Sequence, residues 1–217
     1  MLRGDKMLVS VTGFIGSGKD TIADHLITEH GFKKESWAGS LKDAVSHIFG
    51  WDRELLEGKT KYSREWREQI DPWWSERLKI DKLSPRWVLQ QWGTEVGRQS
   101  FHNDIWIASL ENKLLKSKDD IVITDTRFPN ELAAIQRLGG TTIRVHRGPK
   151  PDWYDDAISV NKGPKHIGWS LSKDRLSKLG IHPSEYSSLG LKFDHEIHND
   201  GTIDELFSCV DHILQLH

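Results

Sequence analysis

The sequence has one cysteine, Cys209, and no apolar run of about 18 residues that could cross a membrane. A single cysteine excludes an intrachain disulfide and a cysteine-rich metal site, and it suits a reducing cytoplasm. The N-terminal MLRGDKMLVS lacks the apolar core of a signal peptide. The formal net charge is −2, so no general nucleic-acid surface is expected. We therefore expect a soluble cytoplasmic globular protein whose anionic ligands, if any, meet local clusters of Lys and Arg.

Tryptophan, by contrast, is abundant: ten are present, and most lie between Trp37 and Trp106. Tryptophan buries a large surface, so most of these side chains are expected to pack in a core or an interface. An exposed Trp-rich segment would favour a homodimer.

Apolar patterning predicts five strands separated by helices, which indicates a parallel sheet with helical crossovers. The expected strands are 7–12, 35–38, 120–125, 141–147 and 194–199. The expected helices are 18–30 ended by Gly31, 40–49 capped by Ser40, 85–96 started by Ser84-Pro85, 104–115, 129–138 and 203–216. Residues 50–83 and 148–190 have weak periodicity and are expected to be irregular, the second as a mobile insertion.

The segment GFIGSGK, from Gly13 to Lys19, matches the phosphate-loop pattern G-x-x-x-x-G-K between the first strand and the first helix. Its glycines let backbone N–H groups point into one concavity, and the helix N-terminus adds partial positive charge. Lys19 is expected to reach the outer phosphates of ATP. Asp20 stands where a hydroxyl that binds Mg²⁺ is usual, and Thr21 follows it. Asp20 therefore either binds Mg²⁺, directly or through water, or only favours the helix dipole.

A second carboxylate, Asp125, ends the apolar run IVITD and is a candidate partner for the metal site, although it could instead cap a turn. Arg127 follows two residues later, and Glu131 falls in the first turn of the next helix. In parallel sheets, ligands sit beyond the carboxyl ends of the strands, where these residues are expected to lie.

Cations also follow several element ends: Lys42, Arg86, Arg98 and Arg127. Together they would suit a second phosphate group, which is already an anionic nucleophile and needs charge cancellation rather than a base. No Ser/His or Cys/His nucleophile arrangement is recognisable, and the spacing of His166, His182, His195 and His198 matches no zinc motif.

GSGKDT, WAGSLKDAV, LQQWGTEVGR, ITDTRFPNE and HNDGTIDEL occur in an order that resembles the deoxynucleoside monophosphate kinases of tailed bacteriophages. The resemblance covers about residues 7–214 and is weakest in 50–83 and 148–190. It implies a P-loop kinase fold with five parallel strands, a helical acceptor-binding insertion and a lid. It also implies transfer of the γ-phosphoryl group of ATP to a dNMP with Mg²⁺, for DNA precursor synthesis, in the host cytoplasm if the gene is viral.

The resemblance also implies roles for individual residues. Catalytic roles fall to Lys19, Asp125 and Arg127, with Asp20 and Asp125 as metal ligands. ATP is assigned to Gly13, Gly16, Ser17, Gly18, Lys19, Asp20, Thr21, Asn199, Gly201 and Thr202. The acceptor nucleotide is assigned to Arg86, Gln90, Gly93, Thr94, Trp106, Arg127 and Glu131, with Lys42 and Arg98 added from their charge and placement.

The implied organisation is one kinase domain over 1–217. Its core would comprise 7–38, 118–147 and 191–217, its acceptor insertion 39–117 and its lid 148–190. Two alternatives stay open at this point: another small P-loop kinase, such as a dephospho-coenzyme A kinase that phosphorylates a hydroxyl, and a P-loop NTPase that acts as a switch. The bases accepted, the deoxy or ribo preference and the oligomeric state do not follow from the sequence.

Overall fold

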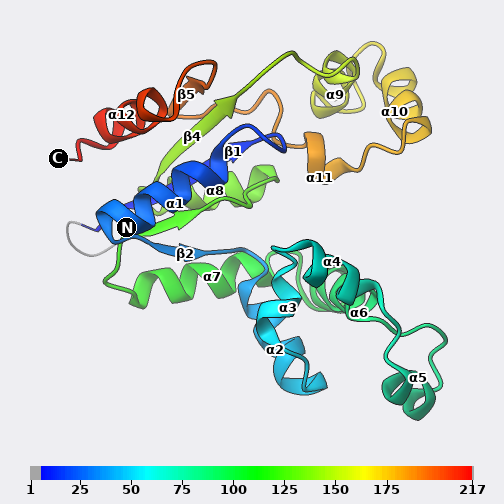
Figure 1. The fold of residues 1–217 in the computed structure, drawn as a ribbon. Helices are drawn as coiled ribbons and strands as arrows, with labels where there is room; N and C mark the ends of the chain where they lie inside the picture. The colour runs from blue at the N-terminus through cyan, green and yellow to red at the C-terminus, as the bar shows by residue number, and fades with distance from the viewer. Residues whose placement is uncertain (1–5, 217) are drawn as a thin grey trace. The chain divides into compact units, whose positions relative to one another are not determined.

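The computed structural model describes residues 6–216, which divide into two compact units (Figure 1). Residues 6–36 and 115–216 form the first, which we call the sheet unit, and residues 37–114 form the second, which we call the helical unit. Within residues 6–216, no helix is long and apolar enough to span a membrane.

The sheet unit is built on five strands in the order β2-β3-β1-β4-β5, and every neighbouring pair is parallel. The strands are β1 (Leu8–Gly13), β2 (Lys33–Glu35), β3 (Ile121–Ile123), β4 (Thr141–His146) and β5 (His195–His198). The predicted five-stranded parallel sheet flanked by helices is therefore confirmed. Because all strands run the same way, their carboxyl ends share one edge of the sheet.

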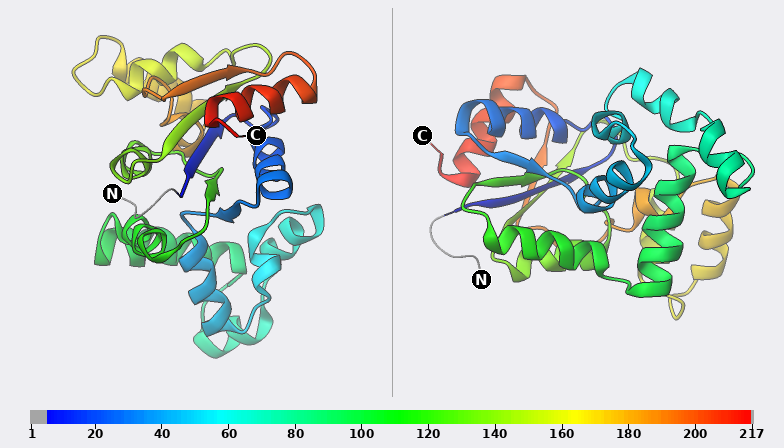
Figure 2. Two further views of the ribbon diagram at one scale, coloured as in Figure 1. Left: turned by 90° about the vertical axis from the view of Figure 1, so that its left-hand side faces the viewer. Right: turned by 90° about the horizontal axis from the view of Figure 1, so that it is seen from below.

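Helices cover both faces of this sheet (Figure 2). The helices α1 (Lys19–His30) and α12 (Ile203–Leu214) pack together on one face, and α8 (Pro129–Arg137) lies on the other. An aliphatic core joins α1 and α12 to the strands, with Val9, Val11, Ile22, Leu26, Val122, Ile143 and Val210 among its fully buried members. The predicted end of the first helix is confirmed, since Gly31 caps α1 in the left-handed conformation with φ 71°.

Segment 148–190 also belongs to the sheet unit and carries α9 (Tyr154–Asn161), α10 (Trp169–Lys178) and α11 (Pro183–Tyr186). The expectation of irregular structure is wrong here, because Ala157, Leu176, Tyr186 and Leu189 form a small buried cluster of their own. Their spacing spans three elements, so no single window of the sequence shows a helical period.

The helical unit contains α2 (Gly39–Phe49), α3 (Arg53–Glu57), α4 (Lys61–Glu68), α5 (Pro72–Leu78), α6 (Pro85–Gln90) and the π-helix η1 (Gln91–Phe101); α7 (Ile105–Lys116) begins in it. Residues 50–83 are more regular than expected. Asp52, Thr60 and Asp71 each accept backbone N–H groups and start the three short helices α3, α4 and α5.

Tryptophans form much of the core of the helical unit. Trp51 is buried, and Trp66, Trp74, Trp87, Trp92 and Trp106 pack against the same cluster. The predicted packing role is confirmed, and of the tryptophans in this unit it is Trp73 that stays open to solvent, at 62% exposed. The exposed Trp-rich surface expected from the sequence is thus limited to one side chain, and the homodimer stays a prediction without that support.

Most expected boundaries are displaced by one to three residues, and four of the differences have a visible structural cause. β2 begins at Lys33, not Glu35, because Phe32 enters the core directly after Gly31 and Lys33 N–H then bonds Asp120 O at 2.8 Å. The helix expected to start at a Ser40 cap has Ala38 at its N-cap, and Ser40 Oγ instead accepts a hydrogen bond from Ser109.

The other two differences lie at the ends of elements. The helix expected to end at Val96 continues as η1 to Phe101. β3 ends at Ile123, so Asp125 lies beyond the strand rather than at its last position. Beyond the end of β3, side-chain hydrogen bonds connect the chain to β1 in place of strand pairing. Ser10 Oγ donates to Thr126 Oγ1 at 2.8 Å, and Thr12 Oγ1 donates to Thr126 O at 3.3 Å.

Candidate active site

The phosphate loop, residues 13–19, joins β1 to α1 at the carboxyl edge of the sheet. Gly16 and Gly18 have φ of 78° and 102°, values that side-chain-bearing residues rarely adopt. A Cβ on Gly18 would lie 2.5 Å from Asn199 Nδ2, and one on Gly13 would collide with Ser17 Oγ and Val145 O. The loop therefore needs glycine both for its backbone angles and for close packing.

Two side chains of this loop have geometry that suits a bound anion. Ser17 is 2% exposed, and its Oγ is a buried oxygen with no hydrogen-bond partner. Lys19 Nζ lies 3.4 Å from Phe14 O within the loop and 3.6 Å from Asp20 Oδ2. An unpaired buried hydroxyl and a lysine resting on a loop carbonyl are both groups that a phosphate would satisfy.

Asn199, which directly follows β5, holds the phosphate loop by a hydrogen bond. Its Nδ2 donates to Ser17 O at 2.9 Å, and its own N–H bonds His146 O at 2.8 Å. Asn199, Gly201 and Thr202 line a hollow of about 330 Å³ beside β5 and α12. Thr202 also caps α12, because it exchanges hydrogen bonds with Glu205.

Asp20 is exposed and engaged with neighbouring side chains. Lys34 Nζ donates to Asp20 Oδ1 at 3.1 Å, and Thr124 Oγ1 donates to the same oxygen at 3.3 Å. Partial burial raises the pKa of Asp20, but the hydrogen bond and charge of Lys34, with the charge of Lys19, leave that pKa below its usual value of 3.8. Asp20 is therefore a carboxylate near neutral pH, and its bond to Thr124 connects it to the segment that carries Asp125.

The DTR segment, residues 125–127, follows β3 at the same edge of the sheet. Asp125 is half-buried, and Arg127 is exposed. Glu131, only 3% exposed, accepts the N–H groups of Arg127 at 2.8 Å and of Phe128 at 3.1 Å through Oε2. Glu131 thus serves the backbone at the start of α8, where it favours the helix dipole and fixes the course of the chain at Arg127. Thr21, in the first turn of α1, lines a separate surface hollow with Asp24, His25 and Phe207.

The predicted acceptor residues lie in the helical unit. Lys42 Nζ donates to Glu57 Oε2 at 2.7 Å, and Arg53 also pairs with Glu57. Burial raises the pKa of Glu57, but Lys42 and Arg53 outweigh it and lower that pKa below 4.5. Arg86 is exposed in the first turn of α6. Arg53 Nε also donates to Asp43 Oδ1 at 2.6 Å, so Lys42 and Arg53 face two carboxylates.

Gln90 and Thr94 are exposed near the junction of α6 and η1, and Arg98 is half-buried further along η1. Trp106 Nε1 donates to Gly93 O at 2.9 Å, which brings two of the predicted acceptor residues into contact. A Cβ on Gly97 would lie 2.7 Å from the Trp106 ring, so this indole packs directly on the backbone of η1. π-helical turns are often found at functional sites.

Sequence reasoning missed Arg67. It lies on α4, and its Nε is buried without a hydrogen-bond partner. Burial lowers the pKa of Arg67, and the nearby charge of Arg86 lowers it further. A Cβ on Gly58 would collide with the Arg67 guanidinium, so Gly58 makes room for it. We call Lys42, Arg53, Arg67 and Arg86 the cation cluster.

Lys34, Thr124 and Thr126 were missed as well. Buried threonines after an apolar strand are a signal that could have drawn attention to the last two. Arg67 offered no such signal, because it lies in a charged segment whose sequence does not distinguish a buried arginine from an exposed one.

The chain has a glycine loop between a strand and a helix, a lysine at the start of that helix, and a carboxylate beyond the neighbouring strand. These features define a P-loop nucleotide-binding protein with a kinase-type fold. No family model matches the sequence. The chain is 36% identical to the deoxynucleoside-5'-monophosphate kinase of Escherichia phage T5, over 87% of this chain and 90% of that protein. It therefore belongs to the deoxynucleoside monophosphate kinase family.

Two further viral proteins and one solved structure are also similar to this chain. A deoxynucleotide monophosphate kinase of Acanthamoeba polyphaga mimivirus is 28% identical, over 97% of this chain and 100% of that protein. The phage T4 deoxynucleotide monophosphate kinase is 21% identical, over 96% and 99%. Among solved structures, Campylobacter jejuni dephospho-CoA kinase matches with a TM-score of 0.42 and 18% identity, covering 97% of each chain.

Proposed function

We propose that this protein transfers the γ-phosphoryl group of ATP to the 5'-phosphate of a deoxynucleoside monophosphate, which yields ADP and a deoxynucleoside diphosphate for DNA synthesis. The observation that carries the proposal is the phosphate loop, with its unpaired Ser17 hydroxyl, in a chain that belongs to this kinase family. Neither a hydroxyl-phosphorylating kinase nor an NTPase switch is better supported.

ATP phosphates would lie in the phosphate loop, where backbone N–H groups, Ser17 Oγ and Lys19 Nζ are the donors. The adenine would pass the loop from Asn199 to Thr202, beside the hollow that those residues line. The bond between Asn199 and Ser17 O supports this assignment, because it couples the adenine side of the site to the phosphate side.

Asp20 and Asp125 would hold Mg²⁺. Carboxylate oxygens are the ligands this ion prefers, and Asp20 is ionised near neutral pH. The ion supplies charge neutralisation on the β- and γ-phosphate oxygens. Lys34 pairs with Asp20 in the structure, and this ion pair would break when Asp20 binds the metal.

In the reaction, an oxygen of the acceptor phosphate attacks the γ-phosphorus, and the bond between that phosphorus and the β–γ bridging oxygen breaks. No proton has to be removed, since the acceptor phosphate is an anion. Lys19 and Arg127 would stabilise the negative charge of the transition state. Glu131 would act as a positioning residue, because it holds the Arg127 backbone.

The acceptor phosphate would be bound by Lys42, Arg67 and Arg86, with Arg98 further along η1. The lowered pKa of Arg67 supports this role. A bound phosphate would compensate the Arg67 guanidinium for its lost hydration and would neutralise its repulsion from Arg86. Gln90 and Thr94, exposed near the junction of α6 and η1, would contact the base, with Gly93 and Trp106 as an apolar wall.

We propose that 39–117 is the acceptor-binding insertion and that 148–190 is a lid. The packing of Phe14, a residue of the phosphate loop, against Trp153 at 5.6 Å and Tyr154 at 6.5 Å supports the second assignment. Through these contacts, a movement of segment 148–190 would displace Phe14 and with it the loop proposed to bind ATP.

The test is ADP release from Mg-ATP in the presence of each dNMP, each NMP and dephospho-coenzyme A. At least one dNMP should stimulate release far above background, and Lys19→Met should abolish the stimulation. If only dephospho-coenzyme A stimulates, or if ADP release is acceptor-independent, the proposed reaction is wrong.

A further inference from the structure

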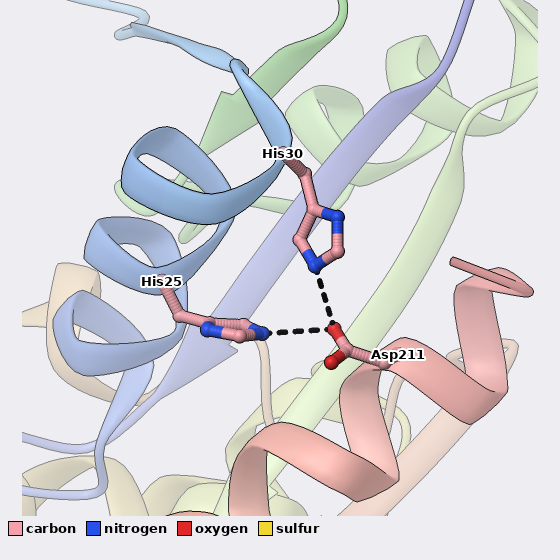
Figure 3. Close-up of side chains that lie close together, drawn as sticks. All are labelled: His25, His30 and Asp211. Carbon is pink, nitrogen blue, oxygen red and sulfur yellow. Dashed lines mark hydrogen bonds and ion pairs between the residues drawn. The ribbon is translucent and has the colours of Figure 1, made fainter. Parts of the chain in front are cut away.

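Two histidines of α1 and one aspartate of α12 converge on a single point of the sheet unit (Figure 3). His25 Nε2 lies 2.8 Å from Asp211 Oδ1, and His30 Nε2 lies 3.1 Å from the same oxygen. Among residues 6–216, this is the single group of three His, Cys, Asp or Glu side chains whose ligand atoms all lie within 4.8 Å of one another. The proposed kinase reaction uses none of them.

The three side chains are held in place by packing. The His25 ring stacks on Phe207 of α12, with centroids 4.1 Å apart and planes 6° apart. It also meets the His30 ring edge to face at 5.2 Å. The side chains of His25, His30 and Asp211 are only 9%, 16% and 29% exposed. Ligands ordered in this way lose little conformational freedom when they bind an ion.

The donor set selects a class of metal. Two imidazole nitrogens and one carboxylate oxygen suit Zn²⁺ and similar transition-metal ions, whereas Mg²⁺ and Ca²⁺ prefer sites made of oxygen. Ligand bonds of about 2.0–2.1 Å at tetrahedral angles place ligand atoms roughly 3.3–3.4 Å apart. The two N···O separations, 2.8 and 3.1 Å, need to open by roughly 0.2–0.6 Å to reach that spacing.

The proton inventory also permits metal binding. An ionised carboxylate only accepts hydrogen bonds, so with Asp211 ionised the two Nε2–H groups are the donors to Asp211 Oδ1. When a metal binds, each neutral ring carries its proton on Nδ1 and offers the Nε2 lone pair instead. One carboxylate charge then faces a divalent cation, and water can complete the coordination.

We propose that His25, His30 and Asp211 form a structural site for Zn²⁺ that ties α12 to α1. A surface hollow of about 520 Å³ lies beside His25, and Asp24 and Glu29 on its wall attract cations. Along α1, His25 lies roughly 9 Å and His30 roughly 16 Å beyond Lys19, so the site lies toward the end of the helix away from the phosphate loop. Its effect is therefore on stability and not on the chemical step.

The test uses the full chain, stripped of metal with a chelator and kept in millimolar Mg²⁺. We expect one Zn²⁺ per chain by calorimetry, visible absorption bands when Co²⁺ replaces it, and a Tm increase of about 5–10 °C at a hundredfold excess of Zn²⁺ over its Kd. Asp211→Asn and His30→Gln, made separately, should each weaken Zn²⁺ binding at least tenfold. His212→Gln, an exposed neighbour on α12, is the matched control and should bind as the wild type does.

Absence of one-to-one binding below about 100 μM Zn²⁺ would overturn the proposal, as would equal binding by wild type and both variants. If Asp211→Asn does not fold, the comparison of Zn²⁺ binding by His30→Gln and His212→Gln tests the proposal alone. A loss of metal-free Tm in the variants without Zn²⁺ binding by the wild type would mean that the three residues form a hydrogen-bonded link only. The readouts are independent of kinase activity, so failure here leaves the proposed function standing.

Discussion

The phosphate loop and the cation cluster are both suited to phosphate, but they are built in opposite ways. The phosphate loop uses backbone N–H groups, glycines at positive φ and one short segment of sequence. The cation cluster takes long side chains from four different helices, α2, α3, α4 and α6, and two of them, Lys42 and Arg53, pair with Glu57. A site made of backbone is fixed by local residues, whereas one made of side chains depends on how helices pack. Substitutions should therefore act differently in the two places.

The largest effect is expected at the end of the sheet where the loop lies. Arg127→Ala should lower kcat by about 100-fold, because it removes a charge proposed to stabilise the transition state, while ATP binding stays nearly unchanged. Steady-state kinetics and an ATP titration would measure the two quantities. Arg137→Ala, at the opposite end of α8, is the control. Loss of ATP binding alone would contradict the assigned role.

In the cation cluster the change should appear in KM. Arg67→Ala should raise KM for the dNMP by roughly 10- to 100-fold, since a hydrogen bond to a charged group contributes about 1.5–3 kcal/mol. KM for ATP should change little. Arg77→Ala, an exposed arginine of α5, is the matched control. An equal rise of both KM values, or a lower Tm with unchanged kinetics, would show that Arg67 only packs against Gly58.

A matched glycine pair separates backbone strain from site geometry. Gly18→Ala and Gly31→Ala both place a side chain at positive φ, which costs about 1–2 kcal/mol of stability. Nothing lies within 4 Å of a Cβ on Gly31, whereas one on Gly18 meets Asn199. Both variants should lose Tm, and only Gly18→Ala should lose ATP affinity. Equal ATP affinity in the two variants would mean that the loop does not need its close packing with Asn199.

The smallest effect is expected from Glu57, the carboxylate that pairs with both Lys42 and Arg53. The pKa of Glu57 is lower in the folded protein than its ordinary 4.5. The stability it contributes is therefore complete above about pH 4.5 and is lost as the pH falls through the lowered pKa. Glu57→Gln should reduce Tm at pH 7 and bring it closer to the wild-type value near pH 3. A Tm difference independent of pH would show that Glu57 acts through packing alone.

The contrast between the two sites also explains what could be predicted. Gly13–Lys19, Asp125 and the five parallel strands follow from short patterns, since strand periodicity and turn chemistry are local properties. The exact ends of β2 and β3 were misplaced, because they depend on pairing between Lys33–Glu35 and Ile121–Ile123, more than 80 residues apart in sequence. The helices within 148–190 do not follow from one window of sequence, because the buried residues Ala157, Leu176 and Tyr186 come from three different elements.

The amino-acid sequence alone determined the phosphate loop, the alternation of strands and helices outside 50–83 and 148–190, and the family resemblance. Tertiary structure alone decided that Glu131 holds the backbone of Arg127, that Arg67 lies beside Arg86, and that Asp211 meets His25 and His30. The histidines are five residues apart, about 140° around a helix, and their partner is more than 180 positions away. Contacts of this kind form only when packed helices bring distant side chains together, so no pattern along the chain records them.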